Sequence, residues 1–422
     1  MRTPVRPPIG RARPGRNGSP HGPPPTVLTM ESPPSPAPSD LGERAPAVSE
    51  LRLAAFRSLR ARTVPVAPVT VLTGPSGSGK STVLEAYEAL ARLGGGEALG
   101  EVFGGARGGP AAFVPHRSPA DRQGRRGFRL GCTVTGPAGE VRFDVAVQAE
   151  PRLCVAGERL SVPEHGTLLS TALRDPARRA VQAEWRTSGP SRVVRAPLPD
   201  DRLGTALLPL RVAGTTDGQR RVLAAAEQVV VALRAAFPCD PRPDTMRDPV
   251  APGDGLLRGG CDNLAAVLRR TRVECATRHA ALVTAVRAGC GSPVTELRAE
   301  GCENGLVRAV LDRGDGAGTT PLERLGDGEL RYAALSLVLL TGPGVLSVDH
   351  VAEVPAARQA LAVLADGVDR ALDARQSRQL LDLAVRMGRR GHIRLLASAG
   401  DAGPVAREAA RMPGVSLVDL GA

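Results

Sequence analysis

Lysine is almost absent from this chain of 422 residues. The chain has 55 lysines and arginines, and only Lys80 among them is a lysine. Aromatic residues are also scarce, at 2 % of the chain, so valine, leucine and alanine must build most of its core. Hydrophobic residues still make up 42 %, which is enough to bury a sizeable core once a polar tail is set aside.

Paired cysteines and long apolar runs are missing as well. The seven cysteines include no C-x-x-C pair and are odd in number, which argues against a zinc site and against a disulfide framework. Such cysteine usage fits a reducing cytoplasm best. No apolar run approaches the roughly 18 to 20 residues of a membrane span, and the N-terminus lacks the apolar region of a signal peptide. We therefore expect a cytoplasmic protein without a membrane segment.

The chain carries a formal net charge of +12. This charge favours contact with phosphate-bearing or acidic partners, although it says nothing about fold or specificity. Arginines lie along the whole chain rather than in one block. Charge alone therefore leaves two interpretations open, a nucleic-acid-binding protein and a protein with a generally basic, solvated surface.

Composition divides the chain into a tail and one domain. Residues 1–47 are rich in proline, arginine, serine and glycine and bury too little apolar surface to offset the entropy of ordering, so we expect a disordered tail. Residues 48–420 are expected to form a single domain. It opens with strands at 49–59 and 64–74, a glycine-rich loop, and a helix at 81–93.

The middle and the end of this domain differ in pattern. Residues 95–290 are expected to form a β-rich side followed by a helical insertion, and residues 294–420 an α/β lobe. In the middle part we expect strands at 127–136, 141–150 and 152–162, and helices at 168–185, 217–236 and 262–288. In the last part we expect strands at 295–300, 305–314, 344–349 and 392–398, and helices at 328–340 and about 368–389.

The sequence "GPSGSGKS" at residues 74–81 matches the phosphate-loop pattern G-x-x-x-x-G-K-[ST], and it follows an apolar strand and opens a helix, as that loop requires. Backbone N–H groups of the loop would surround the β-phosphate, Lys80 would reach the β- and γ-phosphates, and the Ser81 hydroxyl would bind Mg²⁺. A compact ammonium enters such a loop where a planar guanidinium does not, which explains why one lysine persists here. The predicted nucleotide-binding residues are Gly74, Pro75, Ser76, Gly77, Ser78, Gly79, Lys80, Ser81 and Thr82.

A phosphate loop alone is compatible with kinases, GTPases, AAA-type motors and ABC-type ATPases. About 245 residues after Lys80, the sequence "LERLGDGELRYAALSLVLLTGPGVLSVDH" at 322–350 resembles the signature helix and Walker B strand of the ABC, SMC and RecF-like ATPases. Further resemblance to bacterial predicted ATPases with a RecF-like, AAA-type core extends over roughly residues 49–400. It implies an α/β fold, a P-loop NTPase of the ABC/RecF-like head type, with a mostly parallel central sheet, an antiparallel β side and a helical insertion.

The resemblance also implies how the site works. In this family ATP and Mg²⁺ lie between two heads, and the signature of one head faces the phosphate loop of the other. By its position in the resemblance, Asp349 is the Walker B aspartate that binds Mg²⁺. The residues alone leave a second interpretation open, in which Asp349 is an N-cap or turn residue. The signature residues, acting in trans, are Leu325, Gly326, Asp327, Gly328 and Glu329.

Three positions depart from the family pattern. Gly326 stands where the family commonly has a serine, His350 stands where hydrolysing members have a catalytic glutamate, and the strand at 392–398 lacks a switch histidine at its end. His350 and Glu353 are the candidate general bases, with no efficient base as the third alternative. Loss of a positioned base costs on the order of 10² to 10⁴ in rate. The sequence therefore predicts ATP binding and leaves ATP hydrolysis open.

Three functions agree with this pattern. The first is an ATPase head whose ATP-dependent dimerisation clamps DNA or a protein partner. The second is an ATP-binding regulatory or scaffold protein with negligible turnover. The third is a DNA-repair ATPase of the RecF type, which the basic charge allows but does not establish.

Overall fold

The computed structural model describes residues 45–188, 192–253, 255–314, 316–342, 344–348, 354 and 359–421. All of them belong to one compact unit, Pro38–Ala422. Ala45 and Ala47 are buried, and the first strand begins at Ala47, the last residue of the predicted tail. The rest of that tail, residues 1–44, lies outside the described residues.

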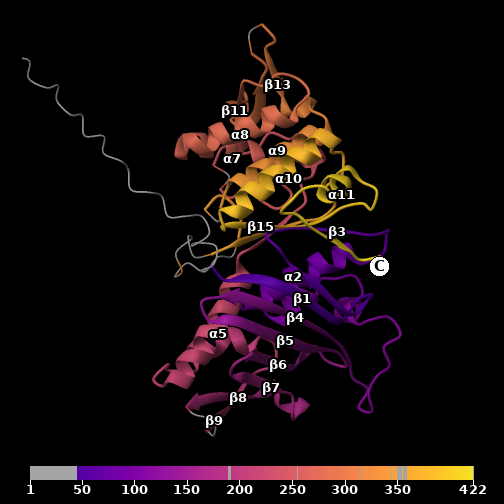
Figure 1. Cartoon of the computed structure of the whole chain (residues 1–422), viewed down its shortest axis with the longest axis vertical. Helices are drawn as coiled ribbons and strands as arrows, with labels where there is room; N and C mark the ends of the chain where they lie inside the picture. The colour runs from indigo at the N-terminus through magenta and orange to yellow at the C-terminus, as the bar shows by residue number, and fades with distance from the viewer. Residues whose placement is uncertain are drawn as a thin grey trace, which may run out of the picture. The chain divides into compact units, whose positions relative to one another are not determined.

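A five-stranded parallel sheet carries the phosphate loop (Figure 1). Its strands lie in the order β10-β14-β15-β3-β16, and each neighbouring pair is parallel. Parallel pairing brings the carboxyl ends of these strands to one edge, where open α/β sheets bind ligands. The bounds are β3 Val69–Thr73, β10 Ala236–Cys239, β14 Leu361–Ala365, β15 Ile393–Ser398 and β16 Ser416–Asp419.

Two antiparallel sheets complete the β structure. The larger has eight strands in the order β2-β1-β4-β5-β6-β7-β8-β9, and the smaller has three in the order β11-β12-β13. The bounds of the larger sheet are β1 Ala47–Phe56, β2 Leu59–Pro65, β4 Arg126–Gly136, β5 Gly139–Glu150, β6 Cys154–Val162, β7 Gly166–Ala172, β8 Ala180–Ser188 and β9 Arg192–Pro199. Those of the smaller are β11 Glu296–Gly301, β12 Val307–Asp312 and β13 Thr319–Pro321. The predicted combination of a parallel sheet with an antiparallel β side is confirmed.

Helices pack on both faces of the parallel sheet. The main ones are α2 Lys80–Gly94, α5 Asp217–Arg234, α7 Leu264–Glu274, α8 Ala276–Gly289, α9 Asp327–Leu340 and α10 Ala374–Arg389. Shorter segments are α3 Leu99–Phe103, α4 Gly204–Leu207, α6 Pro243–Met246 and α11 Pro404–Ala409, with 3₁₀ turns η1 Gly109–Phe113, η2 Pro176–Arg178, η3 Leu208–Leu210 and η4 Leu322–Arg324. Among the described residues, no helix is long and apolar enough to cross a membrane.

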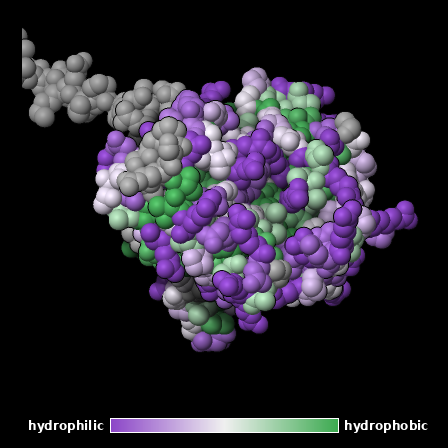
Figure 2. All heavy atoms as spheres, turned by 90° about the horizontal axis from the view of Figure 1, so that it is seen from below, coloured by the Kyte–Doolittle hydropathy of each residue, from purple (hydrophilic) through white to green (hydrophobic). Residues whose placement is uncertain are grey.

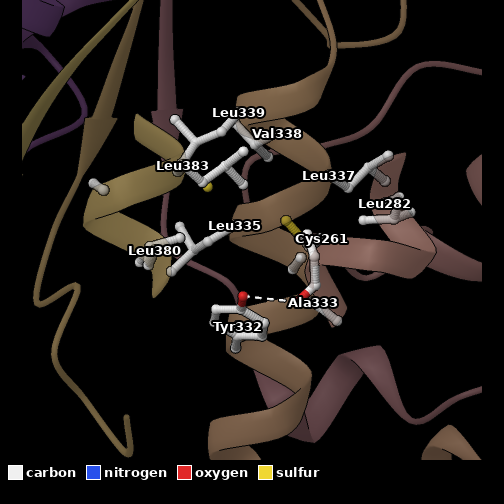
Figure 3. Close-up of a cluster of buried hydrophobic side chains, with 14 of the residues drawn as sticks. Cys261, Leu282, Tyr332, Ala333, Leu335, Leu337, Val338, Leu339, Leu380 and Leu383 are labelled. Carbon is white, nitrogen blue, oxygen red and sulfur yellow. Dashed lines mark hydrogen bonds between the residues drawn. The ribbon is translucent and has the colours of Figure 1, made fainter. Parts of the chain in front are cut away.

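The parallel sheet separates two hydrophobic cores. Side chains alternate along each strand, so Val71 faces one core and the next residue, Leu72, faces the other. The first core contains α7 to α10 and the three-stranded sheet, and Figure 3 shows its centre around α9. There the Tyr332 hydroxyl, which is buried, donates a hydrogen bond to the Ala285 carbonyl at 2.9 Å. The second core lies between the parallel sheet, α2, α5 and the eight-stranded sheet.

Most predicted elements are confirmed, including the helices at 81–93, 217–236 and 328–340. The predicted helix at 168–185 is wrong, because these residues form the antiparallel strands β7 and β8, in which Leu169 pairs with Trp185. Pro176 would interrupt a helix there, and pairing with β6 buries Leu169. The predicted helix at 262–288 is two helices, since Cys275 takes an extended conformation between α7 and α8.

Three more corrections concern the last quarter of the chain. Residues 344–348 form no strand, and only an isolated bridge joins Leu346 to Leu257. In the parallel sheet, the strand next to β15 is β14 instead. The helix predicted to start near 368 starts at Ala374 instead. Its N-cap residue is Asp373, which forms a capping box with Gln376 in the first turn of the helix. A further strand, β16, follows β15.

Hydrophilic residues cover most of the molecular face in Figure 2, with hydrophobic residues in small patches between them. Among the described residues, large apolar side chains are exposed at a few positions, two of which, Val193 and Val194, are neighbours in β9. Val273 on α7 is the most exposed of those in the described residues, at 86 %.

Candidate functional site

The glycine-rich loop at residues 74–79 lies between a strand and a helix, as its sequence predicts. It runs from Gly74 to Gly79, between the end of β3 and the start of α2 at Lys80. Gly77 and Gly79 have φ values of +85° and +99°. Residues with a Cβ atom rarely adopt this backbone conformation, so glycine is needed at both positions. The predicted order of strand, glycine loop and helix is therefore confirmed.

Lys80 folds back over this loop. Its ammonium nitrogen Nζ donates hydrogen bonds to the carbonyl oxygens of Gly74 at 2.6 Å and Pro75 at 2.9 Å. The carbonyls hold the positive charge at the mouth of the loop, beside the N-terminus of α2. A helix N-terminus and an ammonium group together favour an anion at this place.

Ser81, the next residue, contacts a carboxylate from a distant part of the chain. Its hydroxyl Oγ lies 3.0 Å from both carboxylate oxygens of Asp366, which directly follows β14. Ser398, at the end of β15, donates a hydrogen bond to the same carboxylate and accepts one from the Gly367 N–H at 2.7 Å. The ends of three strands thus meet at Ser81.

A hydroxyl and a carboxylate are the oxygen ligands that Mg²⁺ prefers. Ser81 and Asp366 therefore fit a divalent cation held beside the phosphate loop. Sequence reasoning missed Asp366, although the signal was present: the apolar run "LAVLA" at 361–365 ends in this aspartate. The Mg²⁺ ligand predicted instead, Asp349, and both candidate bases, His350 and Glu353, lie outside the described residues.

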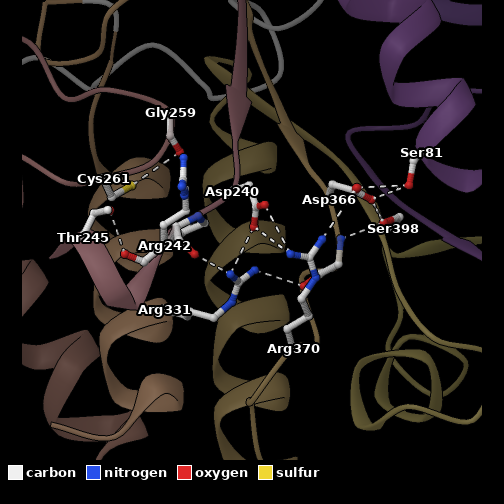
Figure 4. A network of polar contacts seen from close by, with 12 residues as sticks. Ser81, Asp240, Arg242, Thr245, Gly259, Cys261, Arg331, Asp366, Arg370 and Ser398 are labelled. Carbon is white, nitrogen blue, oxygen red and sulfur yellow. Dashed lines mark hydrogen bonds and ion pairs between the residues drawn. The ribbon is translucent and has the colours of Figure 1, made fainter. Parts of the chain in front are cut away.

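An ion-pair network continues from Asp366 into the molecule (Figure 4). Arg370 lies 3.7 Å from Asp366 and 3.2 Å from Asp240, which follows β10. Asp240 also pairs at 3.1 Å with Arg331, a buried side chain of α9. Arg331 donates a further hydrogen bond to the Gly367 carbonyl at 3.1 Å. The carboxylates of the site are therefore linked to α9 through two arginines.

A cavity of about 720 Å³ opens beside Ser81 and Asp366. Its lining includes Glu88 of α2 as well as Asp240 and Arg242, which follow β10. Burial raises the pKa of the Glu88 carboxyl above its usual range, an effect that nearby Arg92 opposes. The volume is within the usual range of ligand pockets.

The five predicted signature residues lie at and before the start of α9. Gly326 is its N-cap residue, and Asp327 accepts a hydrogen bond from Arg247 at 2.6 Å. Arg247 also donates to the carbonyl of Leu325, which is buried. Glu329 lies 3.9 Å from Arg313.

Gly328 packs against the chain between β14 and α10. A Cβ on Gly328 would lie 2.3 Å from the Ala371 carbonyl oxygen, so this glycine is required by close packing of α9. Packing within the chain thus accounts for one signature glycine without any ligand. The placement of the signature against a second copy stays a prediction.

Comparisons with known proteins give only a distant likeness. No protein-family model and no curated protein matches the chain. The SMC head domain from Thermotoga maritima is 13 % identical, with 86 % of this chain and 92 % of that chain covered and a TM-score of 0.39. An SmcHead bound to the C-winged helix domain of ScpA is 14 % identical, with 84 % and 90 % covered and a TM-score of 0.39.

A third solved structure is an Smc head domain with an extended coiled coil, bound to the C-terminal domain of ScpA derived from Pyrococcus furiosus. It is 12 % identical, with 84 % of this chain and 89 % of that chain covered and a TM-score of 0.42. At these identities the likeness is a distant one of fold.

Proposed function

We propose that this chain binds ATP and Mg²⁺ at residues 74–82 and that nucleotide occupancy controls its association with a second copy or with a macromolecular partner. One observation is the main support for a nucleotide site here. The hydroxyl oxygen of Ser81, next to the loop lysine, lies 3.0 Å from the carboxylate oxygens of Asp366, at the ends of the parallel strands. A cation site and an anion site are thus adjacent, as a magnesium nucleotide requires.

In this proposal, different residues of the chain bind the phosphates and the Mg²⁺ ion. Backbone N–H groups of the loop and the start of α2 bind phosphate oxygens, and Lys80 exchanges its two loop carbonyls for the charged phosphates. Ser81 and Asp366 hold Mg²⁺, and Ser398 orients the carboxylate by a hydrogen bond. When bound, Mg²⁺ would neutralise charge on the phosphates.

Hydrolysis is expected to be slow. The residue after Asp366 is Gly367, which offers no side chain to activate water. Asp240, which lines the cavity, is paired with two arginines. His350 and Glu353 stay as candidate bases, and without a positioned base the rate falls on the order of 10² to 10⁴. Gly367 therefore favours the second candidate function, an ATP-binding regulatory or scaffold protein.

The partner is proposed from charge and from the signature at the start of α9. A net charge of +12 favours a phosphate-bearing partner such as DNA over a basic protein partner. A DNA partner would agree with a RecF-like repair protein. The exposed Asp327 and the N-terminus of α9 are proposed to face the phosphate loop of a second copy.

Equilibrium binding of ATP in Mg²⁺ tests the site, with Lys80→Ala as the control. We expect the wild-type chain to bind ATP, and we expect Lys80→Ala to weaken binding by roughly tenfold or more, because a charge-assisted hydrogen bond contributes about 1.5–3 kcal/mol. Light scattering should show a larger species with ATP than without it. Phosphate release no faster than that of Lys80→Ala would favour the regulatory function over the ATPase.

A further inference from the structure

We propose that Arg370 binds the terminal phosphate of the nucleotide and makes the site prefer a nucleoside triphosphate to a diphosphate. This inference rests on the nucleotide site proposed above. It concerns a guanidinium that the sequence pattern did not indicate, because Arg370 belongs to none of the predicted motifs.

The first observation is that Arg370 fills the space next to residue 367. Gly367 has a φ of +57°, and a Cβ there would lie 2.2 Å from the Nε atom of Arg370 and 2.8 Å from its Cζ and Nη2 atoms. A side chain at position 367 and the guanidinium in this position exclude each other. The guanidinium thus lies directly against the Gly367 backbone, and a cation occupies the volume directly after Asp366.

The second observation is the position of the guanidinium relative to the site. Its Nη2 atom lies 3.7 Å from Oδ2 of Asp366, and both oxygens of that carboxylate lie 3.0 Å from the Ser81 hydroxyl. A ligand held by Ser81 and Asp366 is thus adjacent to Arg370 (Figure 4). The Arg370 side chain is 53 % exposed, so it can turn without disturbing a packed core. A planar guanidinium matches two phosphate oxygens at once.

The third observation is that Arg370 can leave its present partner at little cost. Asp240 accepts hydrogen bonds from Arg370 at 3.2 and 3.3 Å, and it also accepts one at 3.1 Å from the buried Arg331. When Arg370 turns to a phosphate, Asp240 and Arg331 remain paired. No buried charge is left alone, so the network can exchange one partner for the ligand.

A purely structural role for Arg370 predicts a different result. Exposed ion pairs contribute about 0–1 kcal/mol to stability, and their loss affects all ligands alike. Binding of the terminal phosphate instead affects ATP and leaves ADP unchanged. The ratio of the two affinities therefore distinguishes the roles.

The experiment measures ATP and ADP affinities in Mg²⁺ for the wild type, Arg370→Gln, Arg370→Lys and a matched control, Arg378→Gln. Arg378 is an exposed arginine of α10. We expect Arg370→Gln to weaken ATP binding by roughly 10- to 100-fold and ADP binding by less than about twofold. Arg370→Lys should restore part of the ATP affinity because it keeps the charge. Arg378→Gln should match the wild type.

Two results would overturn this inference while the nucleotide site stands, provided that the wild type binds ATP and Lys80→Ala binds it more weakly. One is an equal loss of ATP and ADP affinity in Arg370→Gln, and the other is no loss of ATP affinity in that variant. Failure of the wild type to bind ATP would overturn the proposed function and this inference together. An unchanged melting temperature of Arg370→Gln would show that the variant is folded.

Discussion

At the scale of single residues, the two charged groups beside the loop, Lys80 and Asp366, each have opposite or polar partners within the chain. The Lys80 ammonium contacts two carbonyls, and Asp366 contacts two hydroxyls and Arg370. In the proposed complex, a magnesium nucleotide would replace the two carbonyl partners of Lys80 and the contact between Asp366 and Arg370, while Ser398 keeps its hydrogen bond to Asp366. Glu88 differs, because burial dominates its environment rather than a close cation.

Glu88 makes stability depend on pH. Burial is the largest influence on its carboxyl and raises its pKa; Arg92 lowers that pKa, and Glu85 and Glu97 raise it. A folded-state pKa above the unfolded value means that the native chain binds the proton more tightly. The stability that protonated Glu88 contributes is therefore fully present below the unfolded pKa, about 4.3, and is lost as the pH rises through the folded pKa.

We expect Glu88→Gln, which cannot ionise, to melt at a higher temperature than the wild type at neutral pH. The difference should disappear in acid, where Glu88 is protonated. Thermal melts from about pH 3.5 to 8 measure this, with Glu140→Gln at an exposed position as the control. An equal or lower melting temperature of Glu88→Gln at neutral pH would contradict the prediction.

At the scale of elements, α9 connects the predicted signature to the core. Its residues from Leu330 to Leu339 are buried on all sides, between α8, α10 and the sheet. Apart from Arg331, which pairs with Asp240, and Ser336, the long side chains of this span are apolar or aromatic, which is typical of a core helix. The two glycines near its start differ in surroundings, since Gly328 contacts the Ala371 carbonyl and Gly326 has open space around it.

Alanine at these two glycines tests whether close packing at Gly328 constrains α9. Gly328→Ala is expected to destabilise the fold by about 1–3 kcal/mol, because a Cβ 2.3 Å from a backbone oxygen forces a shift that outweighs the roughly 1 kcal/mol gained in helix propensity. Gly326→Ala is the matched control: a Cβ has open space there, so the cost should stay within about 1 kcal/mol, from the poorer N-cap preference of alanine alone. Urea unfolding measures both, and equal midpoints would show that the close contact does not constrain α9.

At the scale of the whole described unit, the two cores share the parallel sheet. Val71 and Leu72, adjacent residues of β3, belong to different cores, and both are fully buried. A defect in either core therefore weakens the sheet that carries the phosphate loop. Unfolding of this part of the chain is expected to be one cooperative transition.

Leu72→Ala tests this coupling. Removal of a buried leucine side chain typically costs about 2–5 kcal/mol. We expect one thermal transition at a lower temperature, not two, because β3 lies between β15 and β16 and supports both cores. Val273→Ala, at a position 86 % exposed, is the control and should leave the midpoint nearly unchanged. Calorimetry that resolves two separate transitions would contradict a shared sheet.

The sequence by itself determined the phosphate loop and most of the elements. "GPSGSGKS" specifies its own backbone, because its glycines adopt positive φ values and its lysine and serine open a helix. Helices such as α5 and α9 follow from spacing of apolar residues within a single segment. These features depend on neighbours close in the chain, which is why they were predicted with small errors in their bounds.

Only the tertiary structure decided which carboxylate meets Ser81. The apolar runs at 344–348 and 361–365 look alike in sequence, yet only the second pairs in the parallel sheet, so Asp366 reaches the loop. Residues 168–185 likewise form strands because β7 pairs with β6 on one side and with β8 on the other. Strand pairing depends on residues far apart in the chain, and no local pattern records it. The contact between Arg370 and Asp240, which are 130 residues apart in the chain, is of the same kind, because the pairing of β10 with β14 brings the two together.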